Sequence, residues 1–85
     1  MKLSDLKNNE TGFVVTPEGS PSFRLRLEEL GFVPGQEVTR LYASPMGTPI
    51  VFSMLGQRVA LRKAEADHIA LSTERPIENY VDQPQ

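Results

Sequence analysis

The chain has 85 residues, a formal net charge of −2 and no cysteine. This length supports one domain with a modest core, and the lack of thiols excludes a disulfide framework, a thiolate metal site and a cysteine nucleophile. The acidic balance is opposite to that of nucleic-acid binders, so we expect no nucleic-acid partner. No apolar run suits a secretory leader or a membrane span. We expect a cytoplasmic protein that is peripheral to a membrane at most.

The chain begins with a predicted turn over residues 4–7 and a first strand over 13–16. One short helix follows, with clear signals at both ends. Ser20 suits the N-cap and Pro21 the first helical position, because the missing N–H of proline is not needed there. Gly31 suits the left-handed residue just past the helix, and Val33-Pro34-Gly35-Gln36 then predicts a type II turn.

The predicted helix has an inner and an outer face. The apolar residues at i, i+4 and i+7 are Phe23, Leu27 and Leu30, and we expect them in the core. Leu25, which lies between Arg24 and Arg26 in sequence, projects almost opposite to this apolar face. Two interpretations remain open: a solvated outer face with one exposed leucine, or a partner surface with Leu25 as its apolar anchor and the arginines around it.

A second strand is predicted over residues 37–43, and a stiff loop with two prolines over 44–49. Met46 lies at the tip of that loop. The flanking prolines lower the entropy cost of presenting Met46 to a partner. Alternatively, Met46 folds back and plugs the barrel end, as methionine readily fills gaps.

A hairpin follows, with strands over residues 50–55 and 58–62 around a Gly56-Gln57 turn of type II′. This register places Phe52 opposite Leu61 and Met54 opposite Val59. A helical turn over 63–67 and a closing strand over 69–71 complete the predicted elements. We therefore expect a domain over residues 1–72 and a flexible tail over 73–85.

These elements predict a mainly β fold, a small five-stranded, partly open barrel with one short helix inserted after the first strand. Side chains fill such barrels, so function is expected on the exterior. Glu65 and His68 are i, i+3 and are the candidate metal ligands; the alternative is that both are polar residues on a surface turn. No hydrolytic triad or phosphate loop is present, so we expect no enzyme and no resident cofactor.

Three motifs together resemble the FeoA family: Arg-Leu-Arg-Leu-Glu-Glu-Leu-Gly-Phe-Val-Pro-Gly over 24–35, Ser-Pro-Met-Gly-Thr-Pro-Ile over 44–50, and Ala-Leu-Arg-Lys-Ala-Glu-Ala over 60–66. The resemblance covers residues 3–71. The positions that match the family pattern are Arg24, Arg26, Leu27, Leu30, Gly31, Pro34, Gly35, Pro45, Gly47 and Pro49. Thr48 departs from it where the family often has an acid. Arg40 replaces a usually apolar strand residue, which indicates an exposed edge.

The resemblance implies an SH3-like barrel and an accessory role in bacterial ferrous iron uptake, with the membrane GTPase FeoB as partner. On this hypothesis the chain is an adaptor that docks on the cytosolic part of FeoB. The expected partner-binding residues are Arg24, Leu25, Arg26 and Met46. Two alternatives are kept: a regulatory module that contacts an iron-dependent transcriptional repressor, and a direct ferrous iron sensor that uses Glu65 and His68.

Overall fold

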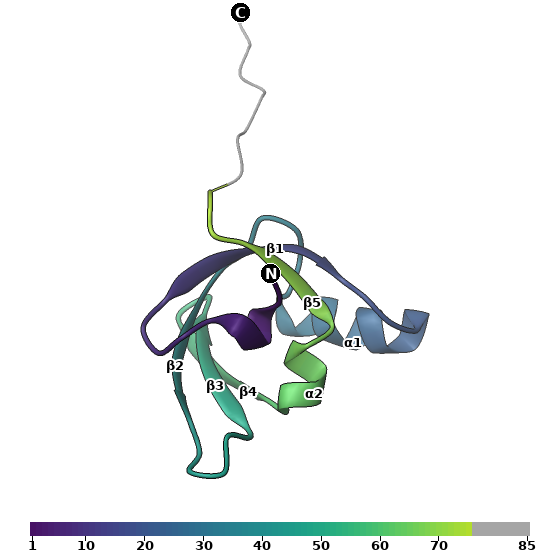
Figure 1. Cartoon of the computed structure of the whole chain (residues 1–85). Coiled ribbons are helices and arrows are strands. Elements are labelled where there is room, and N and C mark those ends of the chain that lie inside the picture. The colour runs from purple at the N-terminus through teal and green to yellow at the C-terminus, as the bar shows by residue number, and fades with distance from the viewer. Residues whose placement is uncertain (76–85) are drawn as a thin grey trace, which may run out of the picture.

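The computed structural model describes residues 1–75, which form a strongly bent antiparallel sheet with short helices beside it (Figure 1). The elements are the 3-10 helix η1 (Leu3–Asp5), β1 (Thr11–Pro17), α1 (Pro21–Leu30), β2 (Glu37–Ala43), β3 (Ile50–Met54), β4 (Gln57–Leu61), α2 (Lys63–Ala66) and β5 (Ile69–Ser72). Most of the predicted tail, residues 76–85, lies outside the described residues, so the boundary at residue 72 remains a prediction.

The five strands have the order β4-β3-β2-β1-β5, and each neighbouring pair is antiparallel. The first and last strands pair with each other, which brings the two ends of the domain together. The sheet is bent but not closed, with β4 and β5 as its edges. The predicted mainly β fold, with five strands and a helix inserted after the first, is confirmed.

Both predicted ends of α1 are confirmed. The Ser20 hydroxyl accepts a hydrogen bond from the Phe23 backbone N–H at 3.3 Å. Gly31 has φ 114°, and the Phe32 N–H donates to the Leu27 carbonyl at 3.0 Å. This pattern is a Schellman end, in which a left-handed residue lets the chain reverse and satisfies the last carbonyls of the helix.

The hairpin of β3 and β4 differs from the predicted register. Its turn residues are Leu55 and Gly56, with φ 55° and 75°, as a type I′ turn requires. Phe52 therefore lies opposite Val59 rather than Leu61, and the same two-residue offset applies along the whole hairpin. Because side chains alternate along a strand, an offset of two residues leaves each side chain on the same face of the sheet in both registers.

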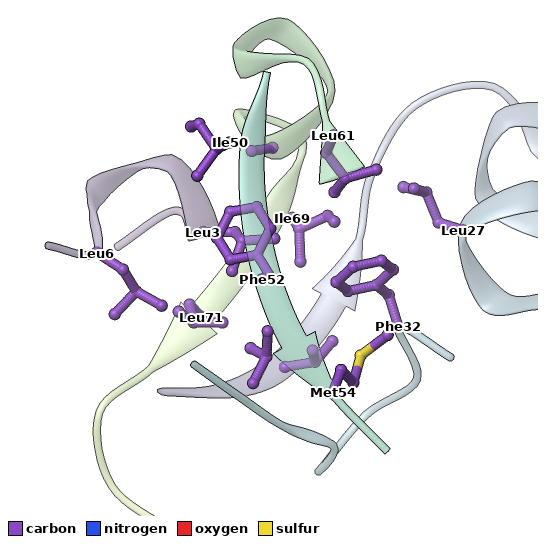
Figure 2. Packing of buried hydrophobic residues seen from close by; sticks show 13 residues of the cluster. Leu3, Leu6, Leu27, Phe32, Ile50, Phe52, Met54, Leu61, Ile69 and Leu71 are labelled. Atoms are coloured by element: carbon purple, nitrogen blue, oxygen red, sulfur yellow. The ribbon is translucent and has the colours of Figure 1, made fainter. Parts of the chain in front are cut away.

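A single apolar cluster fills the concave side of the sheet (Figure 2). Its buried members are Leu3, Leu6, Val14, Leu27, Phe32, Val38, Ile50, Phe52, Met54, Leu61, Ala66, Ile69 and Leu71. The core position predicted for Leu30 was wrong, since that side chain is 40% exposed. The chain reverses at Gly31, so fully buried Phe32 joins the core instead of Leu30.

Helix α1 extends from one edge strand toward the other. Near its start, the Phe23 ring packs edge-on against His68, directly before β5, with centroids 5.4 Å apart. At its end, a β-carbon built on Gly31 would lie 2.9 Å from Leu55 Cδ1, in the turn that precedes β4. The inner face of α1 thus covers the side that the sheet leaves open, and its outer face remains turned away.

Arg40 does not mark an exposed edge, because β2 lies between β1 and β3. Its Nη1 donates to the Leu6 carbonyl at 3.0 Å and its Nε donates to Asn8 Oδ1 at 2.9 Å. The predicted edge was therefore wrong. The guanidinium instead fixes the segment that joins η1 to β1, which explains how a charged side chain is accommodated inside the sheet.

Candidate interaction surface

The outer face of α1 presents Leu25, whose side chain is 55% exposed. Arg24 and Arg26 are about 200° apart around the helix axis, so they leave on opposite flanks. Arg26 turns toward α2, where its guanidinium pairs with the Glu65 carboxylate and lies 5.6 Å from the Phe23 ring centroid. The two arginines therefore border Leu25 on different sides and form no single basic cluster.

Glu65 and His68, the predicted metal ligands, are engaged separately. Glu65 Oε1 accepts from the Arg62 backbone N–H at 2.9 Å, and Oε2 pairs with Arg26. The Arg62 N–H, helped by Arg26, holds the pKa of Glu65 below its ordinary value. The His68 ring packs against Phe23. In the described part of the chain, no three His, Cys, Asp or Glu side chains are grouped to hold a metal ion. A ferrous iron sensor remains a prediction.

Met46 is 91% exposed at the tip of its loop, so the alternative in which it plugs the barrel is wrong. The loop is closed by its own hydrogen bonds. The Ser44 N–H donates to the Pro49 carbonyl at 3.1 Å, and the Gly47 N–H donates to the Ser44 carbonyl at 2.8 Å. The Ser44 hydroxyl also donates to the Thr48 carbonyl. These bonds hold the loop extended from the sheet, with the methionine directed outward.

Helix α2 connects the two predicted binding elements (Figure 1). On one side the Lys63 backbone N–H donates to Thr48 Oγ1 at 3.1 Å. On the other side Glu65 pairs with Arg26 of α1. We refer to the outer side of α1, α2 and the 44–49 loop as the α1–α2–loop surface.

Sequence reasoning missed three features of this region. It did not foresee that Thr48 binds α2 or that Glu65 joins α2 to α1. Glu65, three residues after the N-cap position Arg62, is a recognisable capping signal. Its second partner, Arg26, lies 39 residues away in the sequence, so no local pattern indicates that pair. It also missed Leu55, an exposed leucine with positive φ beside the end of α1. A Leu-Gly pair at a hairpin tip was the available signal.

None of the helices in residues 1–75 is long and apolar enough to cross a membrane. The sequence model of the FeoA domain family matches residues 1–73. The chain belongs to the FeoA family. It is 33% identical over 69 residues to a fusion of Fe(2+) transport protein A with the Fe(2+) transporter FeoB from Porphyromonas gingivalis. That match covers 81% of this chain but only 8% of the fusion protein.

Solved structures of family members have the same fold. The FeoA protein from Chlorobium tepidum is 30% identical with a TM-score of 0.81, covering 100% of this chain and 81% of that one. The zinc complex of Stenotrophomonas maltophilia FeoA, described as a procaryotic SH3 domain protein, is 32% identical with a TM-score of 0.75. The coverage there is 88% of this chain and 96% of that chain. The expected SH3-like fold is thereby confirmed.

Proposed function

We propose that this member of the FeoA family is a non-enzymatic accessory of ferrous iron uptake that docks on the cytosolic part of a FeoB-type transporter. The observation that carries the proposal is the Porphyromonas gingivalis fusion, in which a similar segment shares one chain with FeoB. Placing two binding partners in one chain raises their effective concentration to the millimolar range. A FeoA domain that is not linked to FeoB would need a binding surface of its own for the same association.

The α1–α2–loop surface supplies suitable contacts for this docking. Leu25 and Met46 are exposed apolar side chains on elements whose backbones are fixed by hydrogen bonds. Burying a side chain of this size contributes about 1.5–3 kcal/mol, and a preformed backbone reduces the ordering cost of binding. Arg24, on the free flank of α1, and Arg26, half exposed beside Glu65, would form the polar rim.

Binding of the purified chain to membranes that contain FeoB tests this proposal. We expect Leu25→Asp and Met46→Asp each to weaken binding at least about tenfold, because a carboxylate replaces a buried apolar contact. Leu55→Asp is the matched control. It also removes an exposed leucine, 64% exposed in the wild type, but lies outside the proposed surface.

Binding that is unchanged in both Leu25→Asp and Met46→Asp would refute the surface. Failure of the wild-type chain to bind FeoB would refute the partner. Capture of an iron-dependent repressor instead of FeoB would favour the regulatory alternative. Calorimetry with Fe²⁺ under anaerobic conditions tests the iron-sensor alternative separately: binding that is lost in His68→Ala would support it.

A further inference from the structure

The first backbone N–H groups of α2 have acceptors from two different sources. The N-terminal N–H groups of any helix lack partners within the helix. Here the Lys63 N–H donates to Thr48 Oγ1 at 3.1 Å, in the Met46 loop. The preceding N–H, from Arg62, donates to Glu65 Oε1 at 2.9 Å. The start of this four-residue helix thus depends on one acceptor from the loop and one from its own carboxylate.

The same Glu65 carboxylate extends to α1. Its second oxygen pairs with the Arg26 guanidinium, whose carbon lies 5.6 Å from the Phe23 ring centroid. Phe23 in turn packs on His68, which lies between α2 and β5. Arg26 is therefore held between a charge and an aromatic face, a geometry that restricts a long and otherwise mobile side chain.

Helix α2 is itself fixed to the body of the domain. Ala66 is fully buried in the core cluster. The Asp67 carboxylate accepts a hydrogen bond from the Ser4 hydroxyl of η1 and lies 3.6 Å from Lys63 Nζ. The Arg62 N–H at Glu65 and the Ser4 hydroxyl at Asp67 are the main causes that lower the pKa of these two carboxyl groups. Both are therefore charged at neutral pH.

We infer that Glu65 and Thr48 are positioning residues, which hold the Leu25 helix and the Met46 loop in one fixed arrangement through α2. Glu65 acts through Arg26, and Thr48 acts through the first N–H of α2; neither needs to contact the partner. The expected effect on binding rests on the proposed docking function. The linkage of α1 to the 44–49 loop through α2 is a property of the free chain. It gives Glu65 a role other than metal binding.

The physical consequence is preorganisation. A partner that contacts Leu25 and Met46 together must find both at their bound separation. If the two elements moved independently, binding would have to order one relative to the other, and that ordering opposes association. Breaking either link should weaken binding without removing any side chain that contacts the partner, and should leave the buried core intact.

The first test uses the free chain and NMR relaxation of backbone amides. Thr48→Val replaces the hydroxyl acceptor with a methyl group of similar size. Glu65→Gln keeps an oxygen for the Arg62 N–H but loses the charge that pairs with Arg26. Glu28→Gln is the matched control, since it makes the same change on the exposed side of α1.

We expect each linking variant to change amide dynamics beyond its own neighbourhood. Thr48→Val should alter residues of α1, and Glu65→Gln should alter residues 44–49. The control lies in α1 itself and should leave residues 44–49 unchanged. A residue with a merely local structural role would affect only α2 and its immediate contact. Changes confined to that neighbourhood in both variants would overturn the inference.

The second test is the affinity for FeoB-containing membranes. We expect Thr48→Val and Glu65→Gln each to weaken binding about fivefold, with thermal midpoints within a few degrees of the wild type. Unchanged affinity in both would overturn the positioning role while leaving the proposed function in place. If the wild-type chain fails to bind FeoB, the proposed function fails, and the free-chain measurement still decides whether α2 links the two elements.

Discussion

Gly31→Ala tests whether the end of α1 requires glycine for two separate reasons. The first is the backbone: φ is 114° at this position, and a left-handed conformation costs an alanine about 1–2 kcal/mol. The second is space. An added β-carbon would lie 2.9 Å from Leu55 Cδ1 and 3.0 Å from Met54 Cε. Leu55 is exposed and can move, but Met54 is buried in the core cluster.

Displacing a packed core side chain typically costs about 1–3 kcal/mol. Together with the backbone term, we expect Gly31→Ala to lower the free energy of unfolding by about 2–5 kcal/mol. The matched control is Gly47→Ala. Gly47 also has positive φ, 87°, but a β-carbon there would meet nothing within 4 Å. In Gly47→Ala, the free energy of unfolding should therefore decrease only by the backbone cost, about 1–2 kcal/mol.

Urea unfolding followed by circular dichroism measures both variants, and the difference between them isolates the steric contribution. Heating provides a second readout, since about 1 kcal/mol corresponds to about 4–8 °C in a domain of this size. Equal losses in the two variants would refute the steric argument. A Gly31→Ala variant as stable as the wild type would refute the left-handed helix end as well.

Two further predictions concern the hairpin and the α2 carboxylates. Leu55→Asn should raise the free energy of unfolding by about 0.5–1 kcal/mol in urea, because asparagine suits positive φ at the first position of a type I′ turn; a lower value would contradict the turn assignment. For pH, the pKa of Glu65 is lowered chiefly by the Arg62 N–H, and that of Asp67 chiefly by Ser4. Groups with a depressed folded pKa stabilise the fold above their ordinary values, 4.5 and 3.8, and lose that contribution as the pH falls toward the folded pKa. The thermal midpoint should therefore decrease once the pH drops below about 4.5, and it should decrease less in Glu65→Gln than in the wild type. Thermal midpoints measured from pH 7 to pH 3 test this expectation. Parallel curves for the two proteins would contradict the role given to Glu65.

The helix and the turn behind it were predictable because their determinants are local. The Ser20 cap bonds to a group three residues away. In the following turn, Gly35 has φ 87° and the Gln36 N–H donates to the Val33 carbonyl at 3.0 Å, as the type II prediction requires. Such bonds form within a few residues, so the amino-acid types at those positions are sufficient to specify them.

The hairpin register was only partly predictable. Leu55-Gly56 and Gly56-Gln57 are both possible two-residue turns in this sequence, and the registers they produce differ by two residues. Both place the same side chains on the inner face. Local patterning therefore could not separate them. It does place Phe52 and Met54 on one face of the hairpin, and the structure shows both side chains buried.

The sequence by itself determined the element types and their order, the two ends of α1, the mainly β class and membership of the FeoA family. Those properties depend on short-range periodicity, on capping and on motif spacing. The tertiary structure alone decided that Leu30 is exposed, that Met46 points outward, and that Glu65 pairs with Arg26. Whether Leu30 or Met46 is covered, and whether Glu65 meets Arg26, depends on where segments far apart in the chain come to lie. That arrangement exists only once the bent sheet has brought α1, α2 and the 44–49 loop to one side.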